Sequence, residues 1–216
     1  MLSSFRFLTR CCVSSNPHES GAVIFHRVIV VTGTPGVGKS ICSRLLASRL
    51  RVRCIDLGEF VREQNLTLGM DSERGTAITD IDRLTASLST VLEGSLQDVI
   101  VEGHLAPHVL DDLPVELAYV LRCDPDELVL RLRKRGFPEL KALENAASEI
   151  LGICLWDAVE RFGRANVAEI DTTSCSPEHV VEEMADILSG RSEHVVGRVD
   201  WLSAVSEQGR LSYFFR

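Results

Sequence analysis

The eight-residue loop from Gly33 to Ser40 restricts the possible folds of this chain more than any other feature. Its sequence, Gly-Thr-Pro-Gly-Val-Gly-Lys-Ser, fits the pattern G-x-x-x-x-G-K-[ST]. The β-branched run Val28 to Val31 precedes the loop, and residues 41–50 follow it with apolar side chains at helical spacing. In this context the backbone N–H groups of the loop wrap around phosphate oxygens. We therefore expect Lys39 to reach the β and γ phosphates and the Ser40 hydroxyl to bind Mg²⁺.

Short apolar segments alternate with helical patterns along the rest of the chain. The strands are apolar at consecutive positions, which is typical of a parallel sheet covered on both faces. The alternation predicts an α/β, three-layer P-loop NTPase fold with a five-stranded parallel sheet flanked by helices and ligands at the carboxyl ends of the strands. Besides the run before the loop, we expect strands at residues 52–55, 99–101, 118–121 and 167–170, turn-rich sequence around 69–72, and helices at 57–66, 80–92, 128–135, 140–162 and 176–188.

Composition excludes some classes of protein. The formal net charge of -8 argues against a general nucleic-acid-binding surface, which needs clustered Lys and Arg. Seven cysteines without a C-x-x-C pair indicate free thiols in a reducing compartment, so we expect a cytoplasmic protein. The aliphatic runs are far shorter than the roughly 20 apolar residues that span a bilayer, and no membrane span is expected.

The two ends of the chain lie outside the expected domain, which covers residues 27–190. Residues 1–26 are expected to form a disordered leader or an upstream extension, although the Ser-rich start with Arg6 and Arg10 also resembles an organellar transit peptide. The tail, residues 191–216, shows only a possible helix around Trp201 to Val205.

Further motifs resemble those of a known family. The segments VIVEGHLAP and LRCDPDELVLRLRKRGF, with Glu144, Asn145 and Glu149 downstream, are similar to the archaeal-type adenylate kinases related to adenylate kinase isoenzyme 6, a family linked to small-subunit ribosome maturation. The resemblance covers about residues 27–190. It implies a broad-specificity kinase that transfers phosphate from Mg-ATP to a nucleoside monophosphate, with a slower ATPase activity.

The resemblance also implies two small insertions. Residues 56–79 match the monophosphate-binding lobe, in which Arg62 and then Arg83 would hold the acceptor phosphate; the alternative is that both are solvated helix residues. Residues 134–144 match a short lid, in which Arg135 would lean over the triphosphate, although ordinary surface charge would also explain this basic stretch. The predicted ATP-binding residues are Gly36, Gly38, Lys39, Ser40, Ile41 and Arg135.

Two residues after the third expected strand have an open role. The eukaryotic members of the family that this chain resembles end this strand with Asp-x-His, whereas this chain has Glu102-Gly103-His104. Glu102 keeps a carboxylate for Mg²⁺, most simply through water, but the extra methylene changes its reach. His104 is either a water-positioning catalytic residue or an ordinary turn histidine. Together with the residues described above, the candidate catalytic residues are Lys39, Arg135 and His104.

Two other classes of protein share the phosphate loop. An NTP-driven assembly factor would use ATP to change its contact with a partner, and the resemblance suggests a small-subunit ribosomal protein as that partner. A shikimate-type small-molecule kinase would lack the Glu-Gly-His and Arg-Gly-Phe motifs. A nucleoside monophosphate kinase should form ADP much faster when AMP is added to ATP, whereas a switch ATPase should not respond to AMP.

Overall fold

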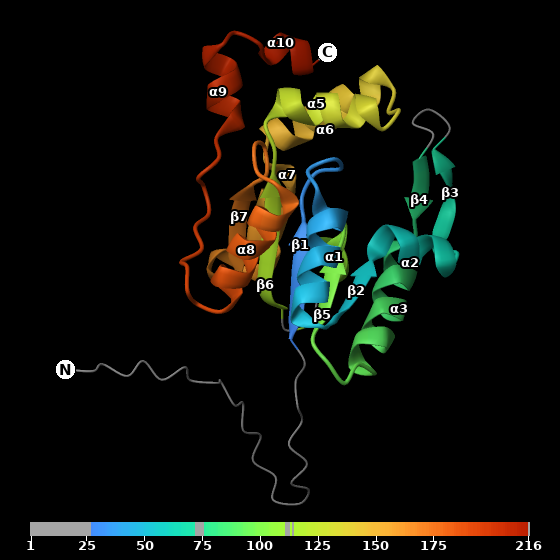
Figure 1. Ribbon diagram of the computed structural model, residues 1–216. Helices are drawn as coiled ribbons and strands as arrows, with labels where there is room; N and C mark the ends of the chain where they lie inside the picture. The colour runs from blue at the N-terminus through green and yellow to red at the C-terminus, as the bar shows by residue number, and fades with distance from the viewer. Residues whose placement is uncertain (1–26, 72–75, 111–112, 114, 216) are drawn as a thin grey trace, which may run out of the picture.

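The computed structural model describes residues 27–71, 76–110, 113 and 115–215, and these form three layers with a parallel sheet in the middle (Figure 1). The expected leader, residues 1–26, lies outside the described residues, which begin at Arg27. The predicted three-layer α/β fold with a five-stranded parallel sheet is confirmed.

The central sheet has the strand order β2-β5-β1-β6-β7, and every neighbouring pair is parallel. The strand that leads into the phosphate loop is central, so the loop emerges between two neighbours at the carboxyl edge of the sheet. All five predicted strands are present, and their bounds are β1 Val28–Thr32, β2 Arg53–Asp56, β5 Val99–Glu102, β6 Val115–Arg122 and β7 Val167–Asp171.

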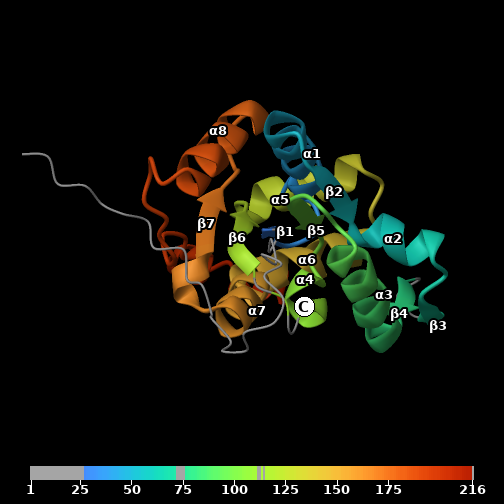
Figure 2. The same ribbon diagram turned by 90° about the horizontal axis from the view of Figure 1, so that it is seen from below.

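Helices cover both faces of the sheet and its carboxyl edge. Figure 2 shows α1 and α8 on one side and α3, α4 and α7 on the other, and Figure 1 shows α5 and α6 above the ends of the strands. Asp80, Asp124 and Ser176 cap three of the helices with side-chain acceptors, which explains why these starts are readable from sequence. The helices are α1 Lys39–Leu50, α2 Leu57–Glu63, α3 Ile81–Glu93, α4 Ala106–Val109, α5 Pro125–Lys134, α6 Glu139–Ile150, α7 Ile153–Phe162, α8 Pro177–Leu188, α9 Trp201–Glu207 and α10 Leu211–Phe214, with a 3₁₀ turn at Arg164–Asn166.

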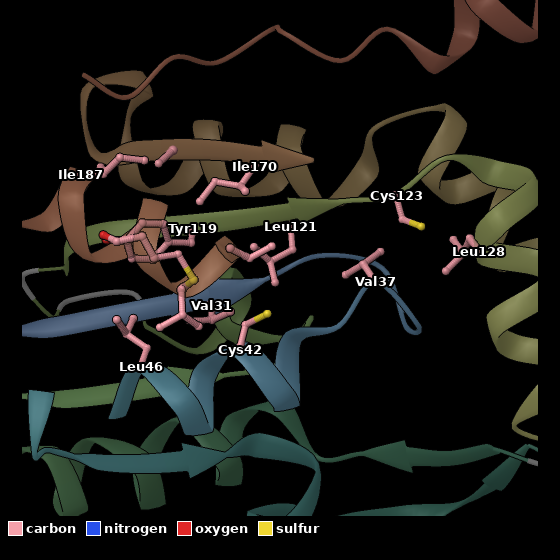
Figure 3. Packing of buried hydrophobic residues seen from close by; sticks show 14 of the residues in the cluster. Val31, Val37, Cys42, Leu46, Tyr119, Leu121, Cys123, Leu128, Ile170 and Ile187 are labelled. Atoms are coloured by element: carbon pink, nitrogen blue, oxygen red, sulfur yellow. The ribbon is translucent and has the colours of Figure 1, made fainter. Parts of the chain in front are cut away.

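Alternate residues of β1 feed two separate cores. Ile29 and Val31 pack into the cluster under α1 and α8, whereas Val28 and Val30 pack into the cluster under α3, α4 and α7. Figure 3 shows Val31 beside Leu46 and Cys42 of α1 in the first cluster. The residues of β1 are consecutively apolar because both faces of the sheet are buried.

Two sequence expectations were wrong in detail. The stretch around residues 69–72, expected to be turn-rich, contains β3 (Thr67–Asp71), which pairs antiparallel with β4 (Thr76–Thr79) outside the main sheet. Strand formation here depends on cross-strand pairing, which local sequence does not reveal. The expected long helix at 140–162 is two helices, α6 and α7, separated at Gly152. Gly152 has φ +65°, in the left-handed region that ends a helix and favours glycine.

The C-terminal tail packs on the domain. The predicted helix near Trp201 is present as α9, and a short helix, α10, follows it. Val205 and Phe214 are buried in the same cluster as residues of α6. The tail therefore contributes to the core on the side of α5 and α6, at the carboxyl edge of the sheet.

Candidate functional site: a phosphate loop closed by an arginine

The phosphate loop joins β1 directly to the N-terminus of α1. Gly38 occupies the N-cap position with φ +107°, no side chain caps the helix, and its first turn contains no acidic residue. The N–H groups at the start of α1 are thus left for a ligand, and the helix dipole favours an anion there. This geometry is the one that the sequence pattern predicts for phosphate binding.

The loop is held in place by packing as well as by its backbone. Val37 is fully buried in the core, and Figure 3 shows it pointing toward Cys123 and Leu128. A Cβ at Gly36 would lie 2.7 Å from Cδ1 of Leu128, so only glycine allows the loop to lie this close to α5. The Thr172 hydroxyl donates to the Val37 carbonyl at 2.8 Å. The loop is therefore a rigid part of the core.

Lys39 is buried at the centre of the site, with 8% of its surface exposed. Its Nζ donates to the Thr34 carbonyl at 3.1 Å, which points the ammonium group back over the loop. Burial lowers the pKa of Lys39, and the negative charge of Glu102 opposes this shift. A phosphate in the loop would supply the anion that this buried cation lacks.

Ser40 and Glu102 form an oxygen-rich pair beside Lys39. Ser40 Oγ donates to Glu102 Oε2 at 3.2 Å, and Asp56 lies opposite Glu102 in the register of β2 and β5. Burial raises the pKa of Glu102 to about 7, with the Lys39 charge acting against the shift. A hydroxyl and carboxylates suit Mg²⁺. Within the described ranges no cluster of three or more His, Cys, Asp or Glu side chains is placed to hold a metal, so an ion here would need oxygens from a nucleotide.

All six predicted ATP-binding residues meet at one cavity. Its volume is about 260 Å³, and Arg135, the residue that follows α5, forms one of its walls. The other basic residues near this end of α5 have different tasks. Arg131 donates to the carbonyls of Thr172 and Thr173, each at 3.0 Å, and Arg133 pairs with Glu139. The Arg135 side chain makes no hydrogen bond or ion pair within the described part of the chain, so it is available to a ligand. The cavity is lined by Gly36, Gly38, Lys39, Ser40, Ile41 and Arg135.

A second cavity of about 170 Å³ continues along the loop toward α8. Ile41 and Cys42 line it from α1, and Thr172 and Cys175 line it from the segment after β7. Asp171, the last residue of β7, accepts hydrogen bonds from the N–H and the hydroxyl of Thr173. The backbone after β7 is thus fixed beside a mostly apolar slot, as a nucleoside requires.

His104 lies in the turn after β5 and is exposed. Desolvation by the surrounding protein and the charge of Lys39 lower the pKa of His104. The imidazole is neutral at pH 7, and its side chain has no hydrogen-bond partner among the described residues.

The two predicted acceptor arginines lie away from the phosphate cavity. Both are exposed and neither lines that cavity. Arg62 folds back over Gly58, with Nη1 3.7 Å from the position that a Cβ would take there, and Asp56 Oδ1 lies 3.2 Å from the same point. This places the Arg62 guanidinium near the carboxyl edge of β2. Arg83 follows the N-cap Asp80 in the first turn of α3.

A cavity of about 740 Å³ lies away from the phosphate loop. It opens between α3, α4 and α7, beside the turn that follows Glu102. No predicted site residue lines it, and its walls are Ile81, Leu105, Pro107, His108, Asp157, Glu160 and Arg161.

Sequence reasoning missed the residues that support the loop from below. Thr34 Oγ1 donates to Glu149 Oε2 at 2.5 Å, and Glu149 also pairs with Arg122. All three side chains are buried. The only signal for Glu149 was its presence among the family motifs, because no local spacing joins it to the loop.

Comparisons with known proteins agree with this geometry. A family model described as an AAA domain matches residues 29–152. Two shikimate kinases share the fold. The match to the enzyme of Bacteroides thetaiotaomicron has 22% identity and a TM-score of 0.54, and it covers 76% of this chain and 98% of that enzyme. The match to the enzyme of Aquifex aeolicus has 18% identity and a TM-score of 0.51, and it covers 76% of this chain and 97% of that enzyme. Fold and loop together define a member of the P-loop NTPase class.

Sequence relatives identify the family more narrowly. A protein of Natronomonas pharaonis, provisionally named an adenylate kinase, is 42% identical over 80% of this chain and 96% of its own length. A protein of the same name from Methanocaldococcus jannaschii is 35% identical over 80% and 92%. The chain belongs to the archaeal-type adenylate kinase family. Among the described helices, none combines the length and apolar character needed to cross a membrane.

Proposed function

We propose that this protein is a broad-specificity nucleoside monophosphate kinase that transfers the γ-phosphoryl group of Mg-ATP to AMP or another monophosphate. The observation that carries the proposal is the convergence of six predicted residues on one phosphate-sized cavity, with Lys39 buried at its base and Arg135 at its mouth. Phosphoryl transfer needs positioning and charge neutralisation rather than a covalent catalyst. The site offers both.

The roles of the residues follow from their positions. Gly36, Gly38 and the start of α1 would hold the β-phosphate by backbone N–H groups, and Lys39 would neutralise charge on the γ-phosphoryl. Ser40 would bind Mg²⁺ with Glu102 holding its water shell, and the ion would supply further neutralisation of the transferring group. Arg135 would complete the shield, and the lid around residues 134–144 would exclude water. His104, in the turn after β5, would orient a water or the acceptor.

We assign the acceptor to the side of α2 and α3. Arg62 lies at the carboxyl edge of β2 beside Asp56, and residues 56–79 are the proposed monophosphate-binding lobe. The 740 Å³ cavity adjoins the first residue of α3 and the turn after Glu102, and its size suits a nucleoside. Arg83 in the first turn of α3 would add a second cation for the acceptor phosphate.

The arginine assignment gives a direct prediction. We expect Arg62→Ala to raise the KM for AMP by about tenfold or more, because a charge-assisted hydrogen bond to phosphate contributes about 1.5–3 kcal/mol. The KM for ATP should stay within about twofold of the wild-type value. Steady-state kinetics with each substrate varied in turn checks this, with Arg49→Ala on the exposed last turn of α1 as the control. Parallel losses for both substrates would contradict the assignment.

The kinase assignment is tested by comparing ADP formation from ATP alone with that from ATP plus each of AMP, CMP, GMP and UMP. We expect at least one monophosphate, AMP first, to raise ADP formation about a hundredfold or more over the ATPase rate, because closure around an acceptor excludes water. A rate that no monophosphate changes would favour the alternative, an NTP-driven assembly factor.

We further propose a cytoplasmic role in small ribosomal subunit maturation, with a ribosomal protein of that subunit as partner. The family resemblance motivates this, and the net charge of -8 suits a basic partner. Binding to purified small-subunit proteins should weaken as salt increases and should differ between ADP and a non-hydrolysable ATP analogue. Brisk AMP-dependent turnover with no ribosomal protein bound would leave a metabolic kinase.

A further inference from the structure

A buried chain of hydrogen bonds begins inside the phosphate loop. Thr34 has two contacts there: its carbonyl accepts from Lys39 Nζ at 3.1 Å, and its hydroxyl donates to Glu149 Oε2 at 2.5 Å. The orientation of Thr34 therefore fixes where the carbonyl that holds Lys39 lies. Thr34 and Glu149 are each 1% exposed, so no solvent competes for these contacts.

Glu149 is in turn oriented by Arg122 at the end of β6. Arg122 Nε donates to Glu149 Oε1 at 2.7 Å, and another guanidinium nitrogen donates to the Glu149 carbonyl at 2.9 Å. The Cys123 N–H donates to the same carboxylate oxygen at 3.2 Å. Both carboxylate oxygens of Glu149 thus accept hydrogen bonds, two at Oε1 and one at Oε2, and these contacts orient its side chain.

Arg122 also binds a second buried carboxylate. Its Nη1 donates to Glu169 Oε1 at 2.5 Å, and the other oxygen of Glu169 accepts the backbone N–H groups of Gly197 and Arg198 at 2.7 and 2.8 Å. Residues 197 and 198 belong to the C-terminal tail, outside the family resemblance. One arginine between two carboxylates leaves a net negative charge, and the two N–H groups of the tail help to offset it.

The same tail returns to the helix that carries Arg135. Arg210 forms two hydrogen bonds with the Asp126 carboxylate, each 2.6 Å, at the first turn of α5. The Arg133 guanidinium donates to Tyr213 Oη at 3.3 Å near the other end of that helix. We call the hydrogen-bonded series Thr34, Glu149, Arg122 and Glu169 the relay. The tail therefore contacts two elements that support the proposed ATP cavity, the relay and α5.

We propose that Glu149 is a positioning residue for the phosphate loop, and that the C-terminal tail keeps it in place through Glu169 and Arg122. The tail is then part of the ATP-binding unit. This inference rests on ATP binding at the loop, which belongs to the proposed function.

The cleanest test begins at Thr34, because truncating Glu149 would leave Arg122 buried without its carboxylate and endanger the fold. Thr34→Val keeps the shape and removes the hydroxyl, whereas Thr34→Ser keeps the hydroxyl. We expect the Kd for Mg-ATP, measured by calorimetric titration of the full chain, to rise about tenfold in Thr34→Val and to stay within about twofold of the wild type in Thr34→Ser. A purely structural contact would lower Tm in Thr34→Val without changing the Kd.

The tail is tested at Arg198, whose contribution to the relay is a backbone N–H. Arg198→Pro removes that donor, and Arg198→Ala retains it. We expect Arg198→Pro to weaken ATP binding several-fold and Arg198→Ala to leave it unchanged. In the double variant Thr34→Val with Arg198→Pro, the Kd should equal that of Thr34→Val alone, because the relay is already cut.

The outcomes separate this inference from the proposed function. Failure of the wild-type chain to bind Mg-ATP would overturn the proposed function. ATP binding that is unaffected by Thr34→Val, or effects of the two substitutions that multiply in the double variant, would overturn the relay. If thermal melting shows that Arg198→Pro is unfolded, Glu169→Gln in the full chain replaces it in the same cycle, with the same two outcomes.

Discussion

Lys39→Met is expected to reduce phosphoryl transfer at least about a hundredfold while the protein stays folded. Lys39 Nζ donates to one acceptor among the described residues, the Thr34 carbonyl, and its charge lies at the phosphate cavity. Removing a charge that is aimed at the transition state costs about two to three orders of magnitude in rate. Met fills nearly the same volume, and burial of an apolar side chain relieves the desolvation that lowers the pKa of Lys39.

The measurement is the AMP-dependent rate of ADP formation, with thermal melting recorded on the same samples. Arg49→Met is a matched control, since Arg49 is a basic residue of the same helix that lies exposed in its last turn. The control should retain the wild-type rate. Near-native turnover in folded Lys39→Met would refute the assignment of the phosphate loop.

Arg135→Ala should lower kcat by more than tenfold and change the KM for ATP less. Arg135 caps α5, is exposed, and forms one wall of the phosphate cavity without a protein partner in the described ranges. A guanidinium that closes on the triphosphate acts mainly on the transition state, which appears in kcat. Because the side chain is exposed, its truncation should change the free energy of unfolding by no more than about 0.5 kcal/mol.

Arg135→Lys is the informative companion, because it keeps the charge and loses the planar fork. An intermediate kcat would show that both charge and geometry contribute. If kcat stayed constant while the KM for ATP rose tenfold, Arg135 would be a binding residue rather than part of the transition-state shield.

The sheet and the phosphate side of the site were predictable because their signals are local. Five runs of consecutive apolar residues gave the strands, and capping residues such as Asp124 and Ser176 gave the helix starts. The loop pattern fixed Lys39 and Ser40, since the chemistry of phosphate binding requires them at that spacing. Arg135 followed from the family motif before Gly136, and the structure places it at the same cavity.

The support beneath the loop was not predictable, because it depends on contacts between distant residues. Thr34 and Glu149 are separated by 115 positions, and no spacing rule joins them. The break at Gly152 was hidden by an apolar pattern that continues through both helices. The contact of the tail with Glu169 is made by the backbone N–H groups of residues 197 and 198, a group that every residue except proline possesses. Only the folded chain reveals which ones are used.

The close packing of Gly36 against Leu128 and Leu132 of α5 affects the timescale on which the lid can move. Because this apolar seam fixes most of α5 against the loop, and the tail holds its first turn through Asp126, the helix has little freedom to swing as a body. Arg133 is tied to Glu139 and Tyr213, so the segment that remains free to move over a bound nucleotide is the short turn that begins at Lys134 and carries Arg135. Motions of such short segments take nanoseconds to microseconds, whereas domain closure takes microseconds to milliseconds. Turnover in this enzyme would then be timed by the chemical step or by the departure of products, and only slightly by the movement of its lid.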